Sequence, residues 1–565
     1  MKKIIFSLII VFIHTALFSQ PSTQFCRKYD LLDGNFLDFG YLTFADSLGY
    51  TTMISAYPDG GSLAFFLLRT DLDGNVVWKN FIPPLGGSTP FRHCCIKASD
   101  NNFVLLVEES VSIYPFNYRI KMAKISPVGN IIWVKYFDNT VGGANVDFPR
   151  TIIETADGGF LINADGNGYN EDLGNFPFAK FLFKTDSNGN LLWAKNLNIK
   201  ALYNIQACWG GNMNVLPDSS YIFAYQGKTI GEPGSDAGGK VVVTKLDKEG
   251  KMKWTKKYFT FGDDGRIDIS TLPDGSSIVS SCRKYGFSFA SSTHLMKIDS
   301  SGNVVWENHV SGDLSNGIEL SNAPSGHIIA LNGDILIAGY DLADIKKRLP
   351  NGDSVIINSA GSENAAGFLG RFSSIDGSLK WYHKFYFPFG TNPPKVNIFG
   401  NSIYNYSTEV GLAQVQELPN QDILITGWVS EPAAHAFGGW DSNTLLLRLG
   451  PDGCMPDQDC NNSMLLPVPE ITKVSLKKDE ISIFPNPSSI GERLTVKFAS
   501  PTSNEGGSEI RVINLQGQLI YSKIISKNEE ETVLELPNAV PQGAYLVSYL
   551  QNGVILSTKK WIYIQ

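Results

Sequence analysis

One short phrase constrains this chain more than any other feature, because it returns at intervals of about 50 to 76 residues. It consists of a polar turn containing glycine, then apolar residues and a tryptophan, as in DLDGNVVW. Glycine accepts a positive φ and Asp or Asn tolerates it, so the phrase predicts a tight turn leading into a strand. The copies are DLDGNVVW at 71, SPVGNIIW at 126, DSNGNLLW at 186, DKEGKMKW at 247, DSSGNVVW at 299, SIDGSLKW at 374 and GPDGCM at 450, the last without a tryptophan.

Each copy belongs to a longer unit that predicts four strands. In residues 150–197, the segments RTIIET, FLINA, FAKFLFKTD and LLWAKNL are separated by turn residues and a long loop. A four-stranded unit cannot bury both of its faces alone, so neighbouring units must cover it. Seven units predict an all-β protein, with a seven-bladed β-propeller followed by a small C-terminal β-sandwich.

The tryptophan of each phrase is predicted to pack against the backbone of the next blade and not to form a ligand cage. Burial of one such ring stabilises the fold by a few kcal/mol, at about 25 cal/mol per Å². These residues are Trp78, Trp133, Trp193, Trp254, Trp306 and Trp381.

The seventh unit ends at its third strand, and the N-terminus is predicted to supply the fourth. FCRKY at 25–29 resembles WTKKY at 254–258, with Phe25 in the place of the tryptophan. We therefore expect residues 25–30 to pair with 443–449, which would close the ring and cover an open strand edge. The alternative is that residues 20–35 form a loose tail.

Residues 1–19 are predicted to be a secretory signal peptide, with Lys2 and Lys3 before a short apolar run. A membrane anchor is the alternative, but His14 interrupts the run, and no other stretch is suited to span a bilayer. Exported chains can form disulfides. Of the seven cysteines, Cys454 and Cys460 lie close enough for a local bridge, and the other pairings stay open.

Charge and spacing exclude some partners. The formal net charge is −8 and the pI is near 5.5, and no Lys/Arg run provides a footprint for phosphates, so nucleic acid is not expected. The cysteine and histidine spacings match no zinc site. No HExxH, GxSxG or phosphate-binding GxxxxGK[ST] phrase is present.

Three segments follow one another along the chain: a propeller over 20–460, a polar, proline-containing linker over 461–479 and a β-sandwich over 480–565. The last segment resembles the type A C-terminal sorting domain of cargo for the type IX secretion system. This resemblance implies a Bacteroidetes-like source, a partner in the type IX machinery, and a secreted or outer cell-surface location. An ordinary adhesive sandwich is the alternative. The matching motif residues are Phe484, Pro485, Asn486, Pro487, Gly517, Gly543, Tyr545, Lys559 and Lys560.

The repeated phrase is also similar to motifs of quinoprotein-type propellers, in which a tryptophan after a turn docks blades, and to the Asp-box of sialidases. Both resemblances are confined to the turn, so no site residues are transferred from either family.

Long loops between second and third strands are expected to share one face, where a binding site would lie at the mouth of the central channel. Aromatic residues there could stack on sugar rings, or could instead pack inside their own loops. The candidates are Tyr169, Trp209, Trp428 and Trp440.

No cofactor is predicted, except that calcium could bind the oxygen-rich segment DGNGYNED. The segment lacks the full EF-hand pattern, so a solvated turn is the alternative. The candidate ligands are Asp165, Asn167, Asn170 and Asp172.

Three functions remain compatible with the sequence. The first is a non-catalytic module that binds extracellular glycan or protein, supported by the purely structural repeat. The second is an extracellular polysaccharide hydrolase or lyase, since carboxylates from different blades could meet in space. The third is a scaffold in a larger surface assembly, which an exposed apolar patch would favour.

Overall fold

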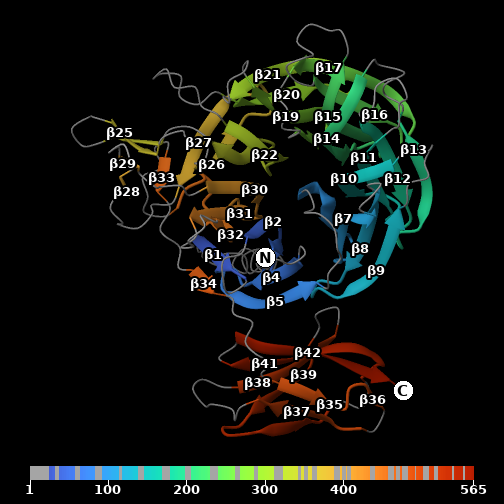
Figure 1. Ribbon diagram of the computed structural model, residues 1–565, viewed down its shortest axis with the longest axis vertical. Helices are drawn as coiled ribbons and strands as arrows, with labels where there is room; N and C mark the ends of the chain where they lie inside the picture. The colour runs from blue at the N-terminus through green and yellow to red at the C-terminus, as the bar shows by residue number, and fades with distance from the viewer. Residues whose placement is uncertain are drawn as a thin grey trace, which may run out of the picture.

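The computed structural model describes part of the chain, and the regular secondary structure of that part is almost entirely β-strand (Figure 1). In the described residues, the helical exception is the short 3-10 turn η1 (Arg92–Cys94). No helix there is long and apolar enough to cross a membrane. The described residues are 24–31, 37–57, 64–82, 92–112, 117–137, 145–167, 178–197, 205–229, 240–260, 267–284, 291–310, 322–341, 345–348, 354–358, 366–386, 395–396, 402–403, 409–432, 440–455, 463–465, 471–473, 481–489, 492–499, 508–514, 519–536, 540–551 and 554–564.

The strands between residues 25 and 449 form units of four antiparallel strands. Unit 1 is β2 (Leu37–Asp46), β3 (Gly49–Tyr57), β4 (Ala64–Thr70) and β5 (Val76–Ile82). Unit 2 is β6 (Cys95–Lys97), β7 (Phe103–Ser112), β8 (Asn117–Ile125) and β9 (Ile131–Phe137). Unit 3 is β10 (Asn145–Glu154), β11 (Phe160–Asn167), β12 (Phe178–Thr185) and β13 (Leu191–Asn196). Unit 4 is β14 (Ile205–Val215), β15 (Tyr221–Thr229), β16 (Lys240–Leu246) and β17 (Met252–Thr260).

The later units follow the same plan. Unit 5 is β18 (Ile267–Thr271), β19 (Ser277–Lys284), β20 (Ser291–Ile298) and β21 (Val304–Val310). Unit 6 is β22 (Asn322–Ile329), β23 (Ile335–Asp341), β26 (Ala366–Phe372) and β27 (Leu379–Tyr386). Unit 7 is β30 (Glu409–Glu417), β31 (Ile423–Pro432), β32 (Trp440–Leu449) and β1 (Phe25–Asp30). Two small hairpins, β24 (Ile345–Arg348) with β25 (Ser354–Asn358) and β28 (Lys395–Val396) with β29 (Ser402–Ile403), accompany unit 6 and the segment after it.

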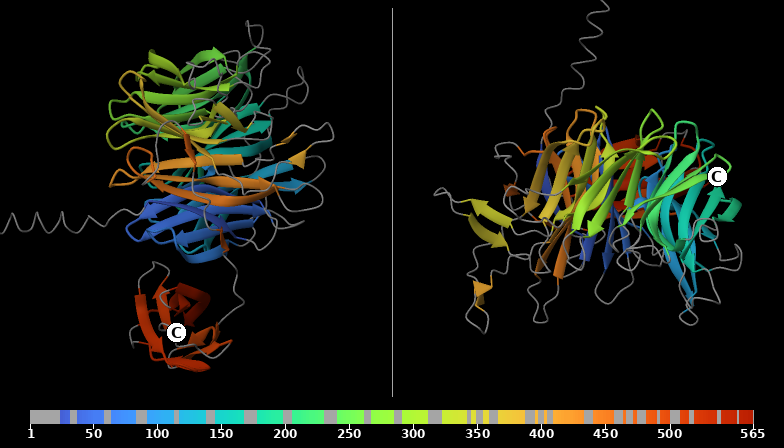
Figure 2. Two further views of the ribbon diagram at one scale, coloured as in Figure 1. Left: turned by 90° about the vertical axis from the view of Figure 1, so that its left-hand side faces the viewer. Right: turned by 90° about the horizontal axis from the view of Figure 1, so that it is seen from above.

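The units are arranged as a ring, in a β-propeller-like architecture (Figures 1 and 2). The first strand of a unit lies towards the centre and the fourth lies at the rim. The chain thus winds outwards through each sheet and returns to the centre for the next. All-β architecture built from four-stranded sheets is confirmed.

The repeated phrase forms the tight turn before each outer strand. In unit 3, Asp186 Oδ1 accepts hydrogen bonds from the backbone N–H groups of Asn188 and Asn190 at 2.9 and 2.8 Å. The Asn190 side chain donates to the other oxygen of Asp186 at 2.9 Å. Gly189 adopts a φ of +76°, a conformation that L side chains rarely take. The aspartate, glycine and asparagine of the phrase therefore have distinct roles in one turn.

At five of the turns, the glycine also makes room for the tryptophan of the preceding unit, whereas Gly129 of unit 2 faces Asn80 and Leu67. A Cβ on Gly302 would lie 2.8 Å from the ring of Trp254, and one on Gly250 would lie 2.6 Å from the ring of Trp193. The predicted docking of tryptophan on the next unit is confirmed at five turns. The pairs are Trp133 with Gly189, Trp193 with Gly250, Trp254 with Gly302, Trp306 with Gly377 and Trp381 with Gly453.

Both ends of the ring meet in unit 7. Strand β1 pairs antiparallel with β32, in a register that places Phe25 opposite Arg448. A Cβ atom on Gly74 would come within 2.8 Å of the Phe25 ring. Phe25 therefore takes the tryptophan position of this unit. The expected pairing of residues 25–30 with 443–449 is therefore present in the structure.

The segment after the ring contains two short strands, which the sequence pattern does not separate from the linker. Strand β33 (Ser463–Leu465) pairs in parallel with β27 of unit 6. Strand β34 (Ile471–Lys473) pairs in parallel with β1 of unit 7. Outer strands have unpaired backbone groups at their free edge, and these two additions satisfy some of them.

The C-terminal module has two sheets around one core, visible at the lower end of the molecule in Figure 1. One sheet contains β35 (Ile481–Phe484), β37 (Leu494–Phe498) and β40 (Glu531–Leu534). The other contains β36 (Ser488–Ser489), β42 (Val554–Ile564), β41 (Gly543–Gln551), β38 (Ser508–Asn514) and β39 (Leu519–Ile525). Trp561 is fully buried in the core between them.

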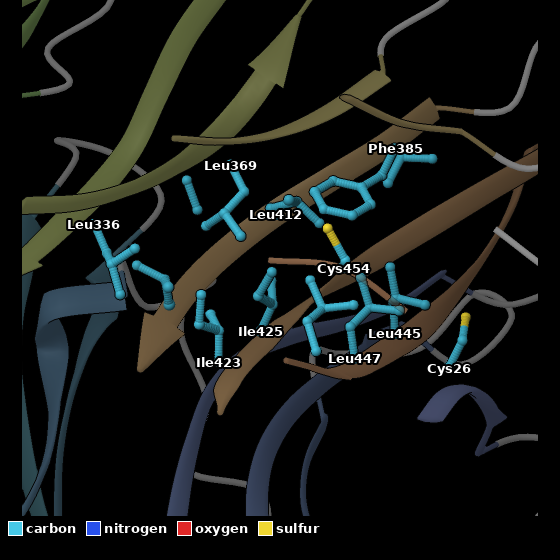
Figure 3. Packing of buried hydrophobic residues seen from close by; sticks show 14 of the residues in the cluster. Cys26, Leu336, Leu369, Phe385, Leu412, Ile423, Ile425, Leu445, Leu447 and Cys454 are labelled. Carbon is cyan, nitrogen blue, oxygen red and sulfur yellow. The ribbon is translucent and has the colours of Figure 1, made fainter. Parts of the chain in front are cut away.

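Hydrophobic clusters fill the spaces between neighbouring units, and Figure 3 shows the one that joins units 6 and 7. Leu369 of β26 and Leu412 of β30 meet there with Ile425 of β31. Cys454 lies in the same cluster and is disulfide-bonded. Its predicted partner, Cys460, lies outside the described residues.

Candidate functional site

The predicted aromatic candidates do not all lie on loops. Trp428 lies in β31, where its ring occupies the space next to Gly411 and meets Phe39 edge-on, with ring centroids 5.5 Å apart. Trp428 therefore packs between units 7 and 1 from a strand, and not inside a loop of its own. Trp209 lies in β14 and Trp440 begins β32, but their side chains are outside the described part. Tyr169 lies outside the described residues altogether.

Asp165, the first calcium candidate, is fully buried in β11 and bound by protein donors. Arg150 Nε donates to its carboxylate at 2.6 Å, and the backbone N–H of Gly210 donates at 2.9 Å. Lys180 forms a second ion pair with it. A carboxylate engaged by two cations is a poor calcium ligand. Of the remaining candidates, Asn167 ends β11 with its side chain undescribed, and Asn170 and Asp172 lie outside the described residues.

Lys180 joins units 3 and 4 through groups that the sequence did not single out. Its ammonium donates to the carbonyl of Gly210 at 2.5 Å and lies 5.3 Å from the centre of the Tyr225 ring. The side chain is fully buried, so its charge depends on Asp165 for compensation. A lysine inside the apolar strand FAKFLFK was the available signal, but its partner could not be read from the sequence.

A second polar group, which we call the channel group, gathers residues from the inner strands of different units. Asp268 of β18 accepts hydrogen bonds from the side chain of Asn212 in β14 and from the backbone N–H of His327 in β22 at 3.0 Å. His93, from η1 in unit 2, approaches the same carboxylate with Nε2 at 3.8 Å. Ser280 is within hydrogen-bonding distance of His327 Nδ1 at 2.8 Å.

The channel group contains serine, histidine and aspartate but lacks the geometry of a nucleophilic triad. In a triad, one imidazole nitrogen faces the serine and the other faces the carboxylate. Here the same Nδ1 of His327 faces Ser280 at 2.8 Å and Asp268 at 3.8 Å. Asp268 also accepts from its neighbour, the N–H of Ile269, at 2.9 Å. The group therefore ties units 2, 4, 5 and 6 together around the centre.

The tight-turn face carries a ring of ion pairs that the sequence pattern does not reveal. Each pair joins a basic residue, two or three positions before the repeated turn, to an acid at the first hairpin of the same unit. The two residues of a pair are 23 to 37 positions apart, so local pattern reading does not find the pairing. The pairs are Arg69–Asp46, Lys124–Asp100, Lys184–Asp157, Lys245–Asp218, Lys297–Asp274, Arg371–Asp334 and Arg448–Asp422.

Electrostatics favour the charged form of Asp157, one acid of this ring of ion pairs. Partial burial raises the pKa of Asp157, but hydrogen bonds from Thr155, Lys184 and Gly159 outweigh it and lower the pKa from 3.8 to about 2. A cleft of about 520 Å³ lies beside another ion pair of this ring. Its lining includes both members of that pair, Asp218 and Lys245, together with Trp254. Within the described residues, no group of three or more His, Cys, Asp or Glu side chains is placed to hold a metal ion.

In the C-terminal module, the structure brings the sorting motif against the last strand. Asn486 Oδ1 accepts a hydrogen bond from the N–H of Ile562 at 2.9 Å, and Trp561 Nε1 donates to Ser488 Oγ at 2.7 Å. Strand β36 then pairs in parallel with β42, with Ser488 opposite Tyr563. The segment FPNP is thus fixed on β42 and contributes to the fold of the module.

The other motif residues occupy varied positions. Phe484 ends β35 and is 45% exposed, which leaves it available to a partner. Tyr545 is buried and donates to the carbonyl of Pro541 at 2.5 Å. Gly543 begins β41, Lys559 is half-buried in β42, and Lys560 lies in β42 with its side chain undescribed. Pro485 and Pro487 belong to the FPNP segment, and Gly517 is outside the described residues.

Comparison with protein families identifies this module. Residues 482–565 match the family described as "Secretion system C-terminal sorting domain". The type IX sorting domain inferred from the motif is therefore confirmed, and a domain of this family indicates export to the cell surface or secretion. A search of curated proteins found no match.

Solved structures share the architecture only distantly. PorZ, described as an essential surface component of the type IX secretion system of Porphyromonas gingivalis, is 10% identical with a TM-score of 0.27, covering 93% of this chain and 70% of its own. A Dyadobacter fermentans protein of unknown function is 9% identical with a TM-score of 0.36, at coverages of 76% and 100%. The α-L-arabinofuranosidase Arb93A of Fusarium graminearum is 12% identical with a TM-score of 0.35, at coverages of 63% and 91%. All three likenesses are too remote to indicate a ligand or an activity.

Proposed function

We propose that this chain is an exported seven-bladed β-propeller that binds an extracellular glycan or protein without catalysis. Its C-terminal β-sandwich is the address recognised by the type IX secretion machinery. The sorting-domain match of residues 482–565 supports the export route. The repeated contact between the outer-strand tryptophan of one unit and the turn glycine of the next supports a closed ring of blades.

The observation that carries the non-catalytic function is the occupation of the interior carboxylates by protein donors. Hydrolysis of a glycosidic bond uses a pair of carboxyl groups, one as acid and the other as base or nucleophile. Asp165 is bound by Lys180 and Arg150, and Asp268 accepts from Asn212 and from backbone N–H groups. Proton transfer by either carboxylate would break these fixed contacts, so both are better suited to bracing the ring.

The ligand site belongs on the face opposite the tight turns. Tight turns and their ion pairs occupy one end of the units, and their aspartates are held by basic residues of the same unit. The second-to-third and unit-to-unit connections must therefore emerge at the other end. Trp209 and Trp440 lie in an inner and a third strand, respectively, and Tyr169 follows β11, so these three remain the predicted contacts.

The test uses the exported full chain on a glycan array and on a panel of extracellular proteins, with a parallel assay for polysaccharide depolymerisation. We expect saturable binding without new reducing or unsaturated ends. The variant Trp209→Ala should lose binding while keeping the melting temperature of the parent. Release of oligosaccharide products would overturn the proposal in favour of a hydrolase or lyase, and absence of binding to every probe would count against a binding module.

A further inference from the structure

The two strands that follow the ring add to neighbouring units in one register. On β27, the residue three positions after Trp381 is Lys384, and it lies opposite Ser463. On β1, the residue three positions after Phe25 is Lys28, and it lies opposite Ile471. Both additions are parallel, and both use equivalent positions of the repeat. The same register on two successive units indicates a defined acceptor edge and not a chance contact.

The residue at this repeat position is less exposed to solvent in the two units that carry an added strand. On units 1 and 2, whose outer edges have no added strand in the described structure, the residue is exposed: Phe81 and Tyr136 are each 46% accessible. Lys384, opposite β33, is half-buried, and Lys28, opposite β34, is 3% exposed. The added strands therefore cover positions that are open to solvent in other units.

The strand that closes the ring is held on both sides. Strand β1 pairs with β32 on its inner side and with β34 on its outer side. Tyr29 is fully buried and donates to the carbonyl of Gly74 at 2.7 Å, which joins the closing strand to unit 1. The N–H of Leu31 donates to Asp38 at 2.7 Å, which adds a second link to that unit. Strand β1 is therefore not a free edge strand at this seam, because both of its sides are hydrogen-bonded.

We propose that the two short strands β33 (463–465) and β34 (471–473) are strand donors that lock the ring, and that the outer edges of β27 and β1 are their acceptor sites. The occupant is this chain's own segment, so the lock does not depend on which ligand the propeller binds. The propeller as a folded unit then extends to Lys473, beyond the boundary at 460 that the sequence predicts.

Hydrogen exchange of the full chain tests the lock. The double variant Ile471→Pro/Thr472→Pro removes two successive N–H groups, so it disrupts the ladder whichever of them faces β1. We expect exchange in residues 25–30 and 444–448 to rise roughly tenfold, while β11 of unit 3 is unchanged. The matched control is Lys477→Pro/Lys478→Pro, which changes the same segment beyond β34. Equal exchange of β1 in the two variants would overturn the proposal.

If the proline variant loses protection from hydrogen exchange throughout the protein, a cross-link provides a second test of the lock. The double variant Lys28→Cys/Ile471→Cys, at two positions opposite each other, should form a disulfide under mild oxidation and slow the exchange of β1. The double variant Lys28→Cys/Lys473→Cys, two positions out of register, is the control. Peptide mass mapping distinguishes the bonds. A cross-link no more abundant than the control, or one that leaves β1 exchange unaltered, contradicts the lock.

Discussion

Trp254 of one unit lies against Gly302 in the turn of the next. A Cβ atom on Gly302 would come within 2.8 Å of the Trp254 ring. The same turn requires a φ of +77° at Gly302. A single glycine thus provides both the left-handed backbone of the turn and the surface on which the ring docks. The effects of these two features on stability can be separated, because Gly158 has the same backbone conformation and no ring against it.

Gly302→Ala should destabilise the protein more than Gly158→Ala. Gly158 has nearly the same φ, +75°, but nothing lies within 4 Å of the position that an alanine methyl group would take there. Alanine at this position should cost about 1–2 kcal/mol for the left-handed backbone. At Gly302 the crowded ring should add about 1–3 kcal/mol. Chemical denaturation of the two variants measures the difference, and equal losses would show that the docking contact contributes nothing.

Lys180→Met should lower the free energy of unfolding by about 3 kcal/mol, because it leaves buried Asp165 with one cation in place of two. Lys253→Met is the matched control, since Lys253 is 55% exposed in its pair with Asp247 and should lose about 0–1 kcal/mol. Adding Asp165→Asn should reduce the loss caused by Lys180→Met. Additive losses in this double-mutant cycle, measured by denaturant unfolding, would mean that the two side chains are not coupled.

Acid sensitivity should depend on the tight-turn aspartates. The folded-state pKa of Asp157 is about 2, below its ordinary 3.8. Its contribution is therefore complete above about pH 4 and is lost as the pH falls towards 2. Asp157→Asn should be less stable than the parent at neutral pH and should show a smaller further decrease in melting temperature between these pH values. Parallel pH profiles for the two proteins would disprove the role of this carboxylate.

Trp561→Ala should unfold the C-terminal module and prevent export. The fully buried indole contacts both sheets and donates to Ser488, so its loss should cost about 3–5 kcal/mol. Ile524→Ala is the control on the same module, because Ile524 is 81% exposed. Immunoblots of medium and surface fractions should show the control exported and Trp561→Ala retained. Normal export of Trp561→Ala would indicate that the machinery needs only an extended motif.

Local chemistry explains which features the sequence could predict. The turns follow from Asp, Gly and Asn within five residues, and Phe25 was recognisable because its neighbours repeat those of Trp254. The channel group was not predictable, because Asp268 meets Asn212, His93 and His327 only after four units close around it. Strands β33 and β34 were also missed, because three residues are too few to show a strand period.

Enclosure of β1 between β32 and β34 also has a consequence for biogenesis. Strand β1 takes both of its partners from β32 and β34, which lie more than 400 residues later in the chain. Until those segments are available, the N-terminal strand and the last sheet each present bare hydrogen-bonding edges. A chain without those segments is therefore expected to pair with the strand edges of other chains, and ring closure removes these edges.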